Sequence, residues 1–277
     1  MDLGIFAKTY PRHRLDDILD AVVADGFSFV QFNMVCAGLE SMPAEIEDHV
    51  VEKIREGLSK RGLRMCALSA TFNMIHPNLS EREKGLQRFA ILAENARAMG
   101  TDLLTLCTGT RDPTSMWRDH PDNATPQAWR DLTDTLLKCI AIAEAHDLRL
   151  GIEPEIHNVI DGPEKARRLL DEMQCPQLVI VMDPANIFRL HDLPQMDMIL
   201  RKAFTLLEPF IALAHCKDVS DDDPPIYGAA GTGVLNYRLY LELLRQMEYQ
   251  GPLIFHSLSE RQVPTSVEYV KSFLSGG

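Results

Sequence analysis

The sequence predicts an α/β fold, a single closed (β/α)8 barrel over residues 1–277. Eight short apolar runs recur along the chain, and longer stretches with helical spacing separate them. Alternating strands and helices build a parallel sheet, and eight such units of about 35 residues are the number that closes a barrel. The alternative is an open, doubly wound sheet. The missing glycine-rich phosphate loop after the first strand argues against it.

The predicted strands are short, apolar and bounded by turn residues, as expected for strands that are buried on both faces. They are Leu3–Ala7, Phe27–Asn33, Arg64–Ala70, Leu103–Gly109, Arg149–Glu155, Leu178–Pro184, Phe210–Asp218 and Pro252–Leu258.

Apolar residues at i, i+3 and i+4 predict the helices between these strands. The predicted ranges are Leu15–Gly26, Glu45–Leu63, Glu81–Gly100, Thr125–Leu148, Asp161–Met173, Met196–Leu207 and Asn236–Gly251. Ser80 and Thr125 are expected to be N-caps, and Pro126 suits a first helical position. Glycines at the ends of several ranges are helix stops.

Composition and charge narrow the class of protein. The net charge of −12 and the isoelectric point near 5.2 disfavour a nucleic-acid partner, because an acidic surface repels phosphates. No apolar run is long enough to span a membrane, and the N-terminus lacks the pattern of a signal peptide. The six scattered cysteines form no CxxC pair, which predicts reduced thiols in a cytoplasmic protein.

Two long loops follow predicted strands and lie at the carboxyl face of the barrel, where active sites form. They cover residues 108–126 and 218–235. The second contains "GAAGTG" (Gly228–Gly233), a weak nucleotide-binding signal, which we interpret as a flexible loop.

Four successive strands end at a residue that can bind a divalent ion. These residues are Glu153, Asp183, His215 and His256. Because parallel strands place their carboxyl ends on one face, the four side chains are expected to converge there. Carboxylate and imidazole ligands together favour Mn²⁺, Co²⁺, Zn²⁺ or Fe²⁺ over Ca²⁺. A single such residue could simply be a polar group that ends a strand, but four in succession indicate a site.

The motifs "GIEPE", "MDPAN", "AHCKD" and "GTGVLNY" resemble those of the xylose isomerase-like superfamily of sugar and sugar-phosphate isomerases and epimerases. The resemblance extends over the whole chain. It implies one divalent metal, with Mg²⁺ also possible, held by residues from strands five to eight. Glu153, Asp183 and His215 match three ligand positions of the family.

The chain departs from the family at two positions. His256 stands where the family usually has the fourth ligand, a glutamate, and Asn186 stands where a histidine often follows the aspartate. His256 could ligate the metal or exchange protons as an acid–base group, and it could also turn away. Glu260 could compensate, although a solvated loop position suits it better.

Further candidates line the expected pocket. His76 could bind substrate hydroxyls or a carbonyl, or simply bond to the loop backbone. Lys217 could stabilise an enediolate or a phosphate, or pair with Asp183 or Asp218. Arg111 could hold an anionic substrate group in a bidentate manner, and Trp117 could form an apolar wall.

Glu155 and His157 follow Glu153 closely. One of them is expected to face the pocket and the other to face solvent, and His157 is the favoured candidate for the pocket.

The resemblance implies a metal-dependent isomerase or epimerase of a small sugar, polyol or sugar derivative. Glu153 or His256 would remove a proton next to a carbonyl, an enediolate would form, and reprotonation would follow, with a dehydratase as a close variant. The alternatives are a sugar-binding or regulatory barrel without catalysis and an endonuclease for abasic DNA, which the acidic charge disfavours. A homodimer or homotetramer is expected by analogy with similar barrels.

Overall fold

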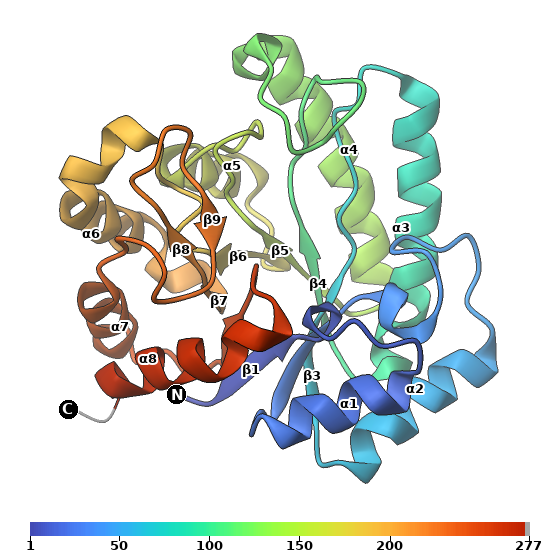
Figure 1. Cartoon of the computed structure of the whole chain (residues 1–277). Helices are drawn as coiled ribbons and strands as arrows, with labels where there is room; N and C mark the ends of the chain where they lie inside the picture. The colour runs from blue at the N-terminus through green and yellow to red at the C-terminus, as the bar shows by residue number, and fades with distance from the viewer. Residues whose placement is uncertain (275–277) are drawn as a thin grey trace.

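Eight parallel strands close into a barrel in the computed structural model, which describes residues 1–274 (Figure 1). The strands are β1 (Leu3–Phe6), β2 (Phe29–Phe32), β3 (Arg64–Ser69), β4 (Leu103–Leu106), β5 (Arg149–Ile152), β6 (Leu178–Met182), β7 (Ile211–Cys216) and β10 (Leu253–Phe255). They follow one another around the barrel in chain order, and β1 pairs with β10 to close it. The predicted barrel is therefore confirmed, and the open sheet is excluded.

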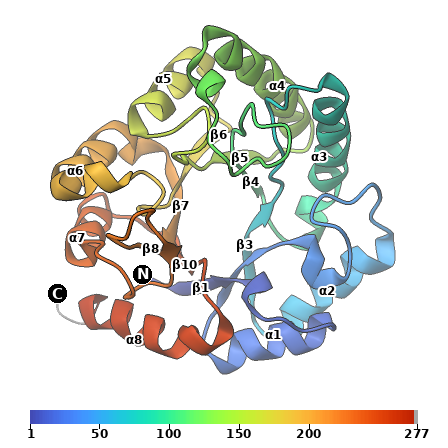
Figure 2. The same cartoon turned by 45° about the horizontal axis from the view of Figure 1, so that its top comes forward.

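A ring of helices surrounds the strands (Figure 2). The helices are α1 (Leu15–Ala24), α2 (Asp48–Lys60), α3 (Leu79–Met99), α4 (Pro126–Ala145), α5 (Pro163–Met173), α6 (Met196–Leu207), α7 (Tyr237–Gln246) and α8 (Val263–Leu274). The sequence analysis did not include α8. None of the helices within residues 1–274 is both long and apolar enough to cross a membrane.

The predicted helix starts are confirmed in one case and wrong in another. Thr125 caps α4, since its hydroxyl oxygen accepts a hydrogen bond from the Ala128 amide at 3.2 Å. Asn78, not Ser80, caps α3, because the Asn78 side chain accepts the Ser80 amide at 2.9 Å. The asparagine starts the helix two residues earlier than the serine would.

The predicted strands are too long at their carboxyl ends. The chain remains buried after β4, but the Gly109 amide donates to the Asn158 side chain at 2.7 Å. The Thr110 amide likewise donates to Asn73 at 3.0 Å. Burial therefore continues beyond β4 while hydrogen bonds to loop side chains replace the pairing between strands. An apolar run in the sequence indicates burial, but it does not show where backbone amides stop bonding to the neighbouring strand.

Short elements connect the strands and helices. They are the 3-10 turns η1 (Ala7–Thr9), η2 (Met34–Ala37), η3 (Pro121–Ala124), η4 (Leu190–Gln195), η5 (Glu208–Phe210) and η6 (Glu260–Gln262), and the small antiparallel pair β8 (Asp218–Val219) and β9 (Tyr227–Gly228).

The glycine-containing loop after β7 is held in place by hydrogen bonds. The buried Asp218 carboxylate accepts the amides of Gly231 at 2.9 Å and Leu235 at 3.0 Å. At Gly231 the backbone has a φ of +88°, which a glycine adopts readily. The interpretation of this segment as a simple flexible loop is therefore not supported.

The barrel interior changes from apolar to polar along the strands. An inner apolar cluster consists of Ala67, Leu103, Val181, Leu213 and Ile254. Side chains two residues apart in a strand share a face, so Thr105 follows Leu103, Asp183 follows Val181 and His215 follows Leu213 toward the carboxyl end. The apolar cluster thus forms the floor beneath a polar site.

Candidate active site

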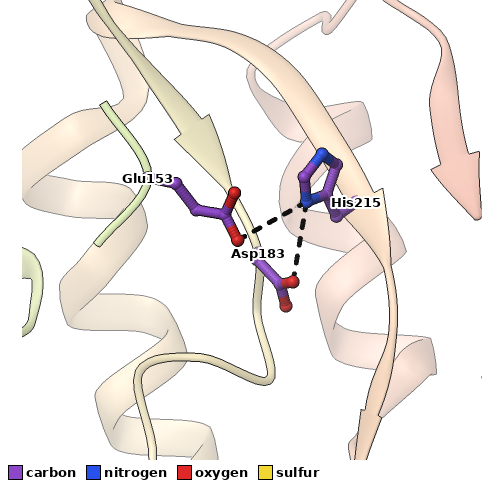
Figure 3. Close-up of side chains that lie close together, drawn as sticks. All are labelled: Glu153, Asp183 and His215. Carbon is purple, nitrogen blue, oxygen red and sulfur yellow. Dashed lines mark ion pairs between the residues drawn. The ribbon is translucent and has the colours of Figure 1, made fainter. Parts of the chain in front are cut away.

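Three of the predicted metal ligands meet at the carboxyl end of the barrel. Glu153 follows β5, Asp183 follows β6, and His215 lies in β7. One ligand atom from each lies within 4.8 Å of the other two. His215 Nδ1 is 3.7 Å from a Glu153 carboxylate oxygen and 3.5 Å from Asp183 Oδ2, as Figure 3 shows. We call these three residues the carboxylate–histidine cluster.

The cluster contains two buried polar atoms without a hydrogen-bond partner. They are Asp183 Oδ2 and His215 Nδ1, and they face each other in a part of the barrel where both side chains are fully buried. Buried polar atoms are rarely left unsatisfied, so such a pair indicates a missing group. Two carboxylates and one imidazole are a suitable ligand set for a divalent transition metal. The residues therefore fit the predicted ion.

Electrostatics in the cluster also favour a cation. Burial alone would lower the pKa of His215, but Glu153 and Asp183 outweigh it and raise the pKa to about 9. Burial alone would raise the pKa of Asp183, but Lys217 and His215 hold it well below its usual value. The carboxyl groups of Glu153 and Asp183 therefore face one position, and a metal there would replace the proton on His215 Nδ1.

Gln31 holds the other side of the His215 ring. Its side-chain oxygen lies 2.8 Å from His215 Nε2, and both residues are buried. The Gln31 amide nitrogen in turn donates to the Thr105 hydroxyl at 3.4 Å. With the oxygen facing the ring, Nε2 carries a proton and donates it, which leaves Nδ1 to face the two carboxylates.

The predicted fourth ligand, His256, lies outside the carboxylate–histidine cluster. Its ring stacks on that of His215 with centroids 5.1 Å apart and 5° between the planes, and Phe6 stacks on the other face. Its Nδ1 lies 2.6 Å from the Ser257 hydroxyl. Burial, together with the charges on His215 and Lys217, holds the pKa of His256 well below its usual value. His256 is therefore a neutral imidazole at the edge of the cluster.

Asn186 connects the cluster to Lys217. Its amide nitrogen donates to a Glu153 oxygen at 2.6 Å, and its amide oxygen accepts a hydrogen bond from the Lys217 ammonium group. Lys217 Nζ also lies 3.7 Å from Asp183 Oδ2. The asparagine therefore orients the Glu153 carboxylate and the Lys217 ammonium group relative to each other.

A cavity of about 680 Å³ opens above the cluster. Glu153, Asn186, Lys217 and His256 line it, as do Glu155, His157 and Trp117. The volume is sufficient for a monosaccharide-sized ligand.

The cavity wall has a polar part, formed by Glu155 and His157. The ring Nδ1 of His157 lies 3.1 Å from a Glu155 oxygen, and this hydrogen bond raises the pKa of His157. The expectation that only one of the two faces the pocket is wrong, because their hydrogen bond holds both at the cavity wall.

Comparison with known proteins identifies the family. Residues 19–273 match the model of the xylose isomerase-like TIM barrel. The chain belongs to this family. No curated protein matches the chain significantly.

Solved structures share the fold over almost the whole chain. The Escherichia coli 3-keto-D-glucoside 4-epimerase aligns with a TM-score of 0.77 and 14% identity, covering 98% of this chain and 99% of that one. A probable 3-DHS dehydratase from Bacillus anthracis gives 0.74 and 16%, with full coverage of both chains. A family member from Mycobacterium smegmatis in complex with magnesium gives 0.73 and 16%, covering 99% and 95%. At these identities the likeness shows the fold alone.

Two predicted substrate residues of this xylose isomerase-like barrel do not line the cavity. Arg111 pairs with Asp131 of α4 and donates to the Ile75 carbonyl at 3.1 Å, so its guanidinium group is occupied by the protein. His76 bonds to the backbone instead, with Nε2 3.3 Å from the Pro113 carbonyl. Glu260 pairs with Arg12 and does not replace the missing fourth carboxylate.

The sequence analysis missed several residues of the site. Phe6, Lys8, Gln31 and Tyr227 line the cavity. Gln31 offered a signal, since it is a polar residue between the apolar Val30 and Phe32 of a predicted strand. Lys8 and Tyr227 lie in connecting segments, where sequence spacing does not indicate the direction of a side chain.

Proposed function

We propose that this barrel is a metal-dependent isomerase or epimerase that acts on a small sugar, polyol or sugar derivative. The observation that carries the proposal is the carboxylate–histidine cluster, with two buried, unpartnered atoms at the mouth of a xylose isomerase-like barrel. The epimerase among the structural neighbours supports this class of activity, and the magnesium complex supports a divalent ion in the site.

Glu153, Asp183 and His215 would hold the ion. A divalent metal bound there would supply Lewis-acid polarisation of a substrate carbonyl. The two carboxylates and the neutral imidazole would give the site a total charge near zero when the ion is bound. The apolar floor beneath the cluster keeps water away from the ion on the other side.

Glu153 is the proposed base. One of its oxygens accepts the Asn186 amide at 2.6 Å, and its carboxylate lines the cavity. Removal of the proton next to the substrate carbonyl would create an enediolate, whose negative charge the Lys217 ammonium group can stabilise from the same cavity wall.

His256 is the proposed partner in proton exchange. The Ser257 hydroxyl occupies its Nδ1, so Nε2 remains to accept or return a proton. Stacking between Phe6 and His215 fixes the plane of the ring. His256 would thus exchange the second proton from the position where the family usually has a glutamate.

A dehydratase on the same site is the second candidate. It shares the first proton abstraction, and the probable 3-DHS dehydratase covers this chain in full. Detection of an unsaturated product by absorbance would favour dehydration, whereas a product of unchanged mass would favour isomerisation or epimerisation.

The first test is metal content, measured by mass spectrometry on protein purified without chelator. We expect about one Mn, Co, Zn, Fe or Mg per chain, and a loss of metal in Glu153→Gln and Asp183→Asn. The matched control is Glu155→Gln, which changes a cavity carboxylate outside the cluster. His256→Ala should retain metal and lose activity.

Each outcome has a defined meaning. Loss of metal in His256→Ala would make that residue a true fourth ligand. No metal in any preparation, even after Mn²⁺ is added, would refute the isomerase proposal and favour a sugar-binding barrel.

A further inference from the structure

The cavity wall includes a lysine, Lys8, that pairs with no carboxylate of the described residues. Lys8 lies in η1, directly after β1, and lines the cavity. Within residues 1–274, no carboxylate oxygen lies within 4.0 Å of its ammonium nitrogen. Its contact is with the Phe6 ring, whose centroid is 4.4 Å from Nζ. Partial burial lowers the pKa of Lys8, although Cys36 and Glu153 oppose this effect.

The other charges that line the cavity are already partnered. Lys217 lies 3.7 Å from Asp183 Oδ2. His157 bonds to Glu155, and Glu153 faces the His215 ring. Among the lysines that line the cavity, Lys8 is therefore the one whose ammonium group has no carboxylate partner within residues 1–274.

The remaining polar wall suits a polyol. Ser41, Ser69, Thr71, Thr105 and Asn33 present hydroxyl and amide groups to the cavity. Such groups can donate to and accept from substrate hydroxyls without adding charge.

We propose that the substrate carries an anionic group, a carboxylate or a phosphate, and that Lys8 binds it. This inference rests on the proposed function, because it assigns the substrate class of the same cavity. Lys8 takes the place that the sequence suggested for Arg111, whose guanidinium group is held by Asp131 outside the cavity. The hydroxyl-bearing wall would bind the polyol part, and the carboxylate–histidine cluster would act on the carbonyl.

The test compares six-carbon polyols with and without an anionic terminal group. Calorimetry on the full-length, Mn²⁺-supplemented protein would measure binding of sorbitol, gluconate and sorbitol 6-phosphate. The variants are Lys8→Met, which keeps the apolar stem, and Lys8→Arg, which keeps the charge. Lys60→Met is the matched control, since it removes one positive charge from the exposed surface of α2.

We expect the wild-type protein to bind one anionic probe about tenfold or more tightly than sorbitol, as charge-assisted hydrogen bonds usually provide. Lys8→Met should abolish this preference, Lys8→Arg should keep most of it, and Lys60→Met should leave it unchanged. A preference for gluconate identifies a carboxylate site, and a preference for sorbitol 6-phosphate identifies a phosphate site.

Three results would overturn the inference: equal binding of charged and neutral probes, no binding of either anion at millimolar concentration, or a preference that survives Lys8→Met. The last would place the anion on the metal or on Lys217. Metal content is measured on the same samples. A Lys8-dependent preference in protein that binds no metal would support this inference and refute the proposed isomerase function, so the two failures are distinguishable.

Discussion

Replacement of Gln31 by leucine is expected to weaken metal binding without touching a ligand. In the structure, the Gln31 side-chain oxygen is 2.8 Å from His215 Nε2, and Gln31 is only 2% exposed. Leucine has a similar size but accepts no hydrogen bond. His215 would then lose the partner that keeps the proton on Nε2 and directs Nδ1 toward the carboxylates.

The magnitude follows from two effects. Loss of an outer hydrogen-bond partner of a ligating histidine typically weakens metal affinity by about 10- to 100-fold, or about 1.4–2.7 kcal/mol. The buried Nε2–H without an acceptor should also lower the free energy of unfolding by about 1–3 kcal/mol, because no water replaces the lost partner.

The assay is calorimetric titration of chelator-treated protein with Mn²⁺, together with urea unfolding in the presence of chelator. Gln31→Glu should restore the affinity for Mn²⁺, since a carboxylate also accepts a hydrogen bond from the Nε2–H group of His215. Thr105→Val, which removes only the 3.4 Å contact to the Gln31 amide, should change affinity little. The reasoning would be refuted if Gln31→Leu bound Mn²⁺ as tightly as the wild-type protein does. It would also be refuted if Gln31→Leu and Gln31→Glu lost the same amount of Mn²⁺ affinity.

Three further predictions concern stability. The hydrogen bond to Glu155 raises the pKa of His157, so its stabilising contribution is complete below about pH 6.5 and is lost as pH rises through the raised pKa. His157→Gln should therefore cost more stability at about pH 6 than at about pH 9, and a difference independent of pH would contradict the pairing. Asp218→Ala should lower the free energy of unfolding by about 3 kcal/mol, because its carboxylate accepts three backbone amides, and limited proteolysis should then cut the loop after β7. Thr125→Ala should lower the free energy of unfolding, measured with urea, by about 1 kcal/mol, because α4 loses its N-cap. An unchanged unfolding transition would show that the cap contributes nothing.

The barrel was predictable because its signals are local. Burial on both faces makes each strand an apolar run, and amphipathic burial gives each helix its spacing. The helix expected around Met196–Leu207 is also present, as α6. The positions of Glu153, Asp183 and His215 were predictable for a related reason, since parallel strands place their carboxyl ends on one face.

Loop side chains were harder to predict, because their direction depends on distant partners. Arg111 follows a barrel strand as a substrate-binding arginine would, but Asp131 of α4, twenty positions later, binds its guanidinium group. His256 follows β10 at the position of a ligand, but its ring stacks between Phe6 of β1 and His215 of β7. Neither partner is adjacent in sequence.

The sequence by itself determined the class of fold, the face that carries the site and three residues of the cluster, because strand periodicity and parallel direction decide them. The tertiary structure decided which side chains share the cavity. It brought Gln31 to His215 and held Arg111 outside the cavity, and it left Lys8 without a carboxylate partner among residues 1–274. These outcomes depend on contacts between strands and helices far apart in the chain, which residue spacing does not encode.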